Sequence, residues 1–242
     1  MRVSCLRSIE DGFLAPFKVI SIMTDIGDGW RPRKGQRDIY GNVIEDRIYT
    51  NSDYDYLDAF RLENGLYRDA IGSDHTALHS VVLPLYYGIT EAKDVVAAVA
   101  LIRQKRLCCG VYMAYFVLKA LARNGEFELM QQLLFSEDIH SWGNMLKEGA
   151  TSCWEAWGRD QKGNTSLCHP WASAPVIIML EDLAGIRAAE PGFRTISFQP
   201  HMPEWLGDVE LNFGTVRGVI SARRIAGKWE LSLDGAPVWK SA

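Results

Sequence analysis

The chain has no long apolar run, no excess of basic charge and no regular cysteine pattern. No apolar segment approaches the roughly 20 residues that a membrane-spanning helix needs, so we expect no membrane partner. The 26 Lys and Arg are outnumbered by 30 Asp and Glu, and the net charge of −4 gives no basic face for nucleic acid. Five cysteines without framework spacing and no apolar N-terminal signal indicate a cytoplasmic protein with reduced thiols.

The central part of the chain reads as a series of short-linked helices. Apolar residues recur at helical spacing within 75–87, 95–106, 111–121, 127–134 and 142–146, and turns or glycines separate the segments. Ser173, Pro175 and Gly185 mark a further helix that is apolar on most sides, so we expect both of its faces to be buried. Successive helical hairpins build bundles, solenoids or α/α barrels.

Composition changes after residue 190. Segments 195–199, 208–213, 216–222 and 228–233 are rich in β-branched and aromatic residues and are separated by Pro and Gly. They predict a small antiparallel β module with an uncovered edge. We therefore expect a mainly α fold with a small β module. It divides into an unassigned, loosely structured segment 1–52, a helical-hairpin domain 53–190 and a truncated β module 191–242.

Half of the eight tryptophans gather in the stretch 140–174. Glu155 stands between Trp154 and Trp157, and His169 lies two residues before Trp171. Aromatic faces in a cleft stack on the C–H faces of sugar rings, so this composition favours a carbohydrate ligand over phosphate or peptide. A carboxylate between two indoles should be partly desolvated, and we expect a raised pKa and a proton-transfer role for Glu155.

The residue types alone also allow structural roles that take no part in binding or catalysis. Glu155 could be a structural or exposed glutamate, His169 a hydrogen-bonded core or loop residue, and the tryptophans core rather than stacking residues. Cys153, Cys168 and His169 show no C-x-x-C or H-x-x-x-H pairing, so we expect no metal and no other cofactor.

Three strings in this half of the chain resemble a known family. GATSCWEAW at 149–157 and HPWASAP at 169–175, followed by PGFRTI at 191–196, are similar to the C-terminal part of bacterial α-L-rhamnosidases of the six-hairpin glycosidase superfamily. The resemblance covers about residues 56–233, and residues 1–50 resemble nothing in the family. It implies a partial (α/α)6 barrel of helical hairpins followed by a β domain, and hydrolysis of terminal L-rhamnosides with inversion.

The resemblance also implies roles for particular residues. Glu155 matches the general base that activates water, and His169 matches a histidine that contacts the sugar. The tryptophans that would shape the pocket or contact the substrate are Trp142, Trp154, Trp157 and Trp171.

One part of the family pattern is missing. The general-acid motif, an acidic string with an arginine that ends in Gly-Trp, does not precede Glu155, and GDGWRPRKG at 27–35 does not match it. We therefore expect a C-terminal fragment that is a poor or inactive hydrolase alone. Such a fragment would associate with a missing N-terminal portion or with itself. The alternatives are a non-catalytic carbohydrate-binding remnant and another six-hairpin enzyme, such as a glucuronyl hydrolase or a disaccharide phosphorylase.

Overall fold

A computed structural model describes residues 60–70 and 72–240 of the chain. The chain divides into two compact units, one of residues 1–84 and 90–98 and the other of residues 85–89 and 99–242. The predicted loose segment 1–52 lies outside the described residues, and the predicted division at residue 190 stays a prediction.

The described part of the first unit is tied together by Arg61. Its guanidinium donates to the carboxylates of Glu91 and Asp94. These contacts join the loop at residue 61 to the short turn η2 (Ala92–Asp94), which runs directly into α5 (Val95–Lys105). Helix α4 (Leu78–Tyr87), with Pro84 inside it, begins in the same unit.

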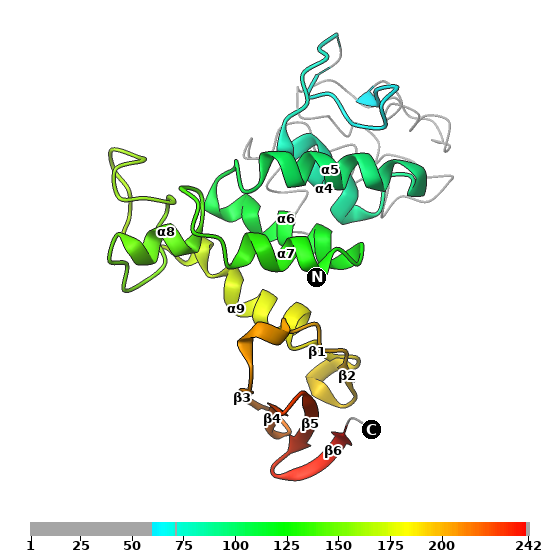
Figure 1. Cartoon of the computed structure of the whole chain (residues 1–242), viewed down its shortest axis with the longest axis vertical. Coiled ribbons are helices and arrows are strands. Elements are labelled where there is room, and N and C mark those ends of the chain that lie inside the picture. Colours follow the sequence, from blue (N-terminus) through cyan, green and yellow to red (C-terminus); the bar gives the residue numbers. More distant parts are fainter. Residues whose placement is uncertain (1–59, 71, 241–242) are drawn as a thin grey trace, which may run out of the picture. The chain divides into compact units, whose positions relative to one another are not determined.

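Helices of the second unit pack as the predicted hairpins. Helix α6 (Val111–Arg123) turns at Asn124 into α7 (Phe127–Leu134), and the two helices lie side by side (Figure 1). Their leucines are buried, four of the five completely, because both helices carry leucine at helical spacing. Helix α8 (Trp142–Lys147) follows, and Ser141 Oγ caps it by accepting from Asn144 N at 3.0 Å. No helix within the described residues is both long enough and apolar enough to cross a membrane.

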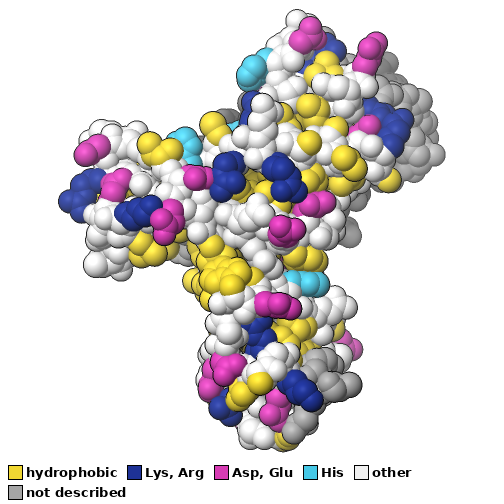
Figure 2. Space-filling model, in the orientation of Figure 1, with side chains coloured by type: hydrophobic (Ala, Val, Ile, Leu, Met, Phe, Trp, Pro, Cys, Tyr) yellow, Lys and Arg dark blue, Asp and Glu magenta, His cyan; other side chains and the backbone are white. Residues whose placement is uncertain are grey.

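The last helix, α9 (Ala174–Ile178), continues as a single π-helical turn, η4 (Met179–Leu183). The expectation that both of its faces are buried is wrong. Ala174 and Ile178 are buried, whereas Val176 is 65% and Ile177 is 43% exposed. Figure 2 shows hydrophobic side chains at the surface near this helix. The helix is therefore apolar all round but covered on one side only within this structure.

A buried charge cluster joins α6 to the end of this helical segment. Lys119 Nζ donates to Asp182 Oδ1 at 3.1 Å and Oδ2 at 2.9 Å, and to Glu181 Oε2 at 2.8 Å. Arg187 donates to the same Asp182 carboxylate. The Asp182 side chain is completely buried and that of Lys119 nearly so, so each depends on the other for charge compensation.

Antiparallel strands form the rest of the second unit. A two-stranded sheet pairs β1 (Ile186–Ala188) with β2 (Ile196–Phe198), and the turn η5 (Pro191–Phe193) lies between these strands. After η6 (Glu204–Leu206), a four-stranded sheet has the order β3-β4-β5-β6. Its strands are β3 (Val209–Thr215), β4 (Gly218–Ile225), β5 (Lys228–Leu233) and β6 (Ala236–Lys240).

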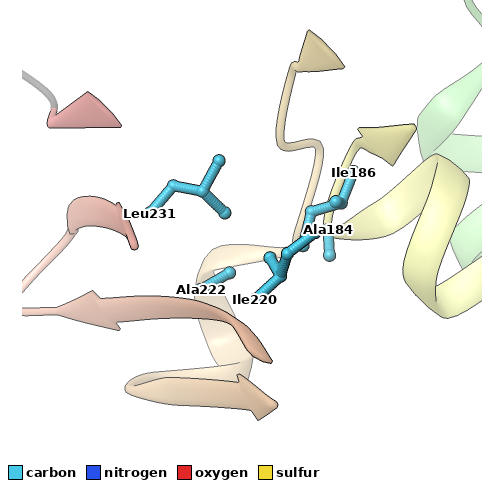
Figure 3. Packing of buried hydrophobic residues seen from close by; sticks show 5 residues of the cluster. All are labelled: Ala184, Ile186, Ile220, Ala222 and Leu231. Atoms are coloured by element: carbon cyan, nitrogen blue, oxygen red, sulfur yellow. The ribbon is translucent and has the colours of Figure 1, made fainter. Parts of the chain in front are cut away.

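The small core of the β region includes residues from both sheets. Ile220, Ala222 and Leu231 from the four-stranded sheet lie close to Ala184 and Ile186 (Figure 3). A Cβ at Gly185 would lie 1.8 Å from Gln199 O, so only glycine allows this close approach between the end of η4 and the segment after β2.

The four predicted strand segments correspond to β2, β3, β4 and β5, whereas β1 and β6 were not predicted. Strand β1 has only three residues and therefore shows no alternation, and Pro237 obscures the pattern of β6. Proline is tolerated there because β6 is an edge of the described sheet.

The charge cluster gives a stability prediction. Asp182→Asn should lower the free energy of unfolding by about 3–5 kcal/mol, because it leaves the buried Lys119 ammonium without its main counter-charge. Glu181→Gln makes the same charge change one residue away, where the side chain is 41% exposed, and should cost about 1 kcal/mol or less. Urea unfolding of both variants measures the difference, and equal losses would contradict the assignment.

Candidate active site

The stretch 140–174 contains a loop whose two limbs pair with each other. Glu155 N donates to Ser166 O at 2.9 Å, and His169 N donates to Cys153 O at 2.7 Å. This pairing places Glu155 and His169 on opposite limbs of one hairpin. The two residues singled out in the sequence are thus brought together.

Three buried tryptophans anchor this loop. Trp157 Nε1 donates to Cys109 O at 2.6 Å, and Trp142 Nε1 donates to Ala172 O at 2.7 Å. The two indoles meet edge to face with ring centroids 4.9 Å apart. Both are buried, and Trp154 is only 2% exposed. The three indoles therefore shape the loop as core residues, and direct contact between them and a substrate stays a prediction.

The fourth tryptophan is placed differently. Trp171 lies in the turn η3 (Pro170–Ala172), and 57% of its surface is exposed. Its ring stands perpendicular to the His169 imidazole, with centroids 4.7 Å apart. Among the four tryptophans predicted to bind substrate, Trp171 is the one whose ring is exposed to solvent.

The Glu155 carboxylate is bound by two groups that the sequence did not indicate. Lys162 Nζ donates to Oε1, and Ser166 N donates to Oε2 at 3.1 Å. The hydrogen bond from Lys162 is the largest cause that lowers the pKa of Glu155, followed by the one from Ser166. The expected rise in this pKa is wrong, because Trp154 and Trp157 turn into the core while the carboxylate meets a cation and a backbone N–H.

Asn144 of α8 and Glu148, the residue that follows α8, anchor the turn after Trp157. Asn144 Nδ2 donates to Trp157 O at 2.9 Å and to Glu148 Oε1 at 2.8 Å. The other Glu148 oxygen accepts from Arg159 N at 2.7 Å, and the Arg159 guanidinium lies over the Trp154 ring, 5.5 Å from its centroid. These contacts fix the base of the turn that carries Lys162. In the sequence these polar residues show no pattern that distinguishes them from solvated ones.

The arrangement can do part of an acid–base reaction. A carboxylate held ionised by a cation and an N–H can accept a proton from water, but it cannot donate one at neutral pH. No cluster of three or more His, Cys, Asp or Glu side chains suited to a metal occurs within residues 60–70 and 72–240. The four cysteines among these residues are free thiols.

Comparison with protein families identifies the chain. The family described as bacterial alpha-L-rhamnosidase 6 hairpin glycosidase domain matches residues 40–183, more than half of the sequence. The chain belongs to this family. The bacterial alpha-L-rhamnosidase C-terminal domain matches residues 185–236. The rhamnosidase match begins at residue 40 rather than at the predicted 56, so residues 40–50 do resemble the family.

Two curated rhamnosidases share the same region. The alpha-L-rhamnosidase of Alteromonas sp. (strain LOR) is 29% identical over 125 residues, and that of Formosa agariphila is 30% identical over 120 residues. These matches cover 49% and 47% of this chain but only 13% and 12% of the relatives. A separate match of 53 residues is 55% identical to the endonuclease subunit of the type I restriction enzyme EcoAI of Escherichia coli. It covers 22% of this chain and 6% of that protein, too little to assign its family.

Solved rhamnosidase structures confirm the fold class. The enzyme of Dictyoglumus thermophilum superposes with a TM-score of 0.64 at 22% identity, over 75% of this chain and 21% of its own. The Streptomyces avermitilis enzyme, solved with L-rhamnose, gives 0.60 at 21% identity, over 74% of this chain and 18% of its own. The rhamnosidase fold of this chain is therefore a partial (α/α)6 barrel of helical hairpins followed by antiparallel strands.

The Lys162 contact gives a titration prediction. Lys162→Ala removes the largest cause of the lowered pKa of Glu155, so this pKa should rise toward its ordinary value. Carbon-13 NMR titration of the Glu155 side-chain carboxyl measures the change. Lys147→Ala is the matched control, because Lys147 pairs with Glu137 at 2.7 Å. An unchanged Glu155 titration in the Lys162 variant would contradict the assigned contact.

Proposed function

We propose that Glu155 is the general base of an inverting α-L-rhamnosidase-type site. In an inverting glycosidase, one carboxylate activates water on one face of the sugar while a second carboxyl protonates the leaving oxygen on the other face. Glu155 would take the proton from water as the water oxygen attacks the anomeric carbon. The observation that carries the proposal is that Lys162 and Ser166 bind the Glu155 carboxylate within the loop of this rhamnosidase-family chain.

His169 would hydrogen-bond the sugar beside the attacking water. Its backbone is fixed by Cys153 O and its ring by Trp171, which supports a preset orientation. The tryptophans Trp142, Trp154 and Trp157 would keep both limbs in place during binding. The substrate class is a glycoside with terminal L-rhamnose, following the family.

The second carboxyl would come from outside this chain. Glu155 would need a general acid about 6.5–9.5 Å away across the bond. No family-type acid motif precedes it. The exposed apolar face of α9 supports association with a portion that carries the acid, or with a second copy. Light scattering of the purified chain, with Val176→Asp as the disrupting variant, would test self-association.

A second candidate function is carbohydrate binding without catalysis. The ion pair between Lys162 and one Glu155 oxygen favours it, because a paired oxygen accepts a proton less readily than a free one. Another six-hairpin glycosidase activity would share the loop but differ in the sugar, which a substrate panel would reveal.

A leaving group that needs no protonation separates these functions. We expect the chain to hydrolyse α-L-rhamnosyl fluoride slowly to the β-anomer, since fluoride departs without a general acid. An aryl α-L-rhamnoside should be hydrolysed ~10²–10⁴-fold less well than by a complete site. Proton NMR of the first-formed sugar measures both the rate and the anomer.

Glu155→Gln should abolish the fluoride reaction, whereas Glu137→Gln, which changes an exposed glutamate paired with Lys147, should not affect it. Equal rates in the wild type and Glu155→Gln would refute the general base. Efficient aryl rhamnoside hydrolysis that depends on Glu155 would show that the chain does contain its acid.

A further inference from the structure

Two exposed aromatic rings touch each other beside the Glu155 loop. Trp171 is 57% exposed and Tyr112, at the start of α6, is 54% exposed. Their ring centroids are 5.5 Å apart and the planes are inclined by 54°. Because Trp171 also contacts His169, a continuous line of rings leads from the Glu155 loop to α6.

Both rings project from backbone that is firmly held. Trp171 sits in η3, where Ser173 N donates to Pro170 O at 3.0 Å and the next residue, Ala172, is fully buried and accepts from Trp142. Tyr112 lies in the first turn of α6 between the buried Val111 and Met113. Neither ring can therefore turn into the core without moving a packed element.

Tyr112 is further supported along its own helix. Its ring meets Phe116 at 5.7 Å between centroids, and Phe116 meets Tyr86 at 5.2 Å. The Arg123 guanidinium covers the Tyr86 ring at 3.8 Å. These contacts support the Tyr112 ring, and Tyr112 and Trp171 are the exposed members of the row.

We propose that Tyr112 and Trp171 form a stacking ledge for the sugar unit to which the terminal L-rhamnose is attached. This inference rests on the proposed function of Glu155 and names the part of the substrate beyond the bond that is cleaved. Two inclined aromatic faces form a corner that fits the C–H face of a pyranose ring. The rings carry a hydroxyl and an indole N–H at their edges, which suit sugar hydroxyls, and neither carries the positive charge that a phosphate would need.

The ledge is tested by comparing two ligands on the whole chain. NMR titration would give dissociation constants for methyl α-L-rhamnoside and for the disaccharide α-L-rhamnosyl-(1→6)-glucose. The second sugar should improve affinity about fivefold to tenfold, as expected for one aromatic contact. Tyr112→Ala and Trp171→Ala should each lose most of this gain. Tyr112→Ala should leave the affinity for methyl α-L-rhamnoside unchanged, whereas Trp171→Ala should also lower it, because Trp171 supports the His169 ring.

Matched variants control for loss of fold and for non-specific stacking. Tyr112→Phe keeps the ring and should keep the gain. Trp205→Ala removes another exposed aromatic, 68% exposed, and should change neither constant. Far-UV circular dichroism and thermal unfolding check that each variant is folded.

The outcomes separate the ledge from the function on which it rests. If methyl α-L-rhamnoside binds but the disaccharide gains nothing, or the gain survives both alanine variants, the ledge is refuted and the proposed function stands. If glucosides without rhamnose bind through Tyr112 and Trp171 while methyl α-L-rhamnoside does not, the ledge stands as a sugar surface and the rhamnosidase assignment fails. If neither sugar binds, both are overturned. A gain produced only by a flat aromatic glycoside would overturn a sugar as the occupant.

Discussion

The candidate site depends on two indole N–H groups that bond backbone carbonyls inside the protein. Trp157 bonds Cys109 O just before α6, and Trp142 bonds Ala172 O just before α9. A buried indole N–H without a partner would be costly, so these bonds fix where the loop can lie. Ala172 is adjacent to Trp171 and Cys109 lies three residues before Tyr112, so the same two bonds also help to position the exposed rings. The contacts that bury the tryptophans therefore also place the functional groups of the loop toward solvent.

The charged and polar groups around Glu155 determine whether this residue can act as a base or as an acid. Glu155 is flanked by tryptophans in the sequence but by Lys162 and Ser166 in space. That environment favours the carboxylate, the form required of a base, and it disfavours the protonated form required of an acid. The lowered pKa of Glu155 suits a general base, and no family-type acid motif precedes this residue in the sequence. We therefore propose that this chain supplies the general base of the reaction.

Much of the fold could be predicted because local pattern and packing agree. The leucines of α6 and α7 recur at helical spacing and are buried, and the alternating segments between residues 195 and 233 became strands. The errors arose where spatial neighbours override local sequence. The apolar sequence of α9 is covered on one side only, and the pKa of Glu155 depends on Lys162, seven positions further along a polar turn. The roles proposed for Glu155 and His169 came from resemblance, since neither residue is chemically distinctive alone.

The most direct test of the account places this loop in a complete enzyme. Residues 140–174 would replace the corresponding segment of the Alteromonas α-L-rhamnosidase, and hydrolysis of an aryl α-L-rhamnoside would be measured. The account predicts an active graft in which Glu155→Gln lowers kcat by ~10²–10⁴-fold. A folded graft that is inactive, or one that is equally active with glutamine at position 155, would contradict the claim that this loop supplies the general base.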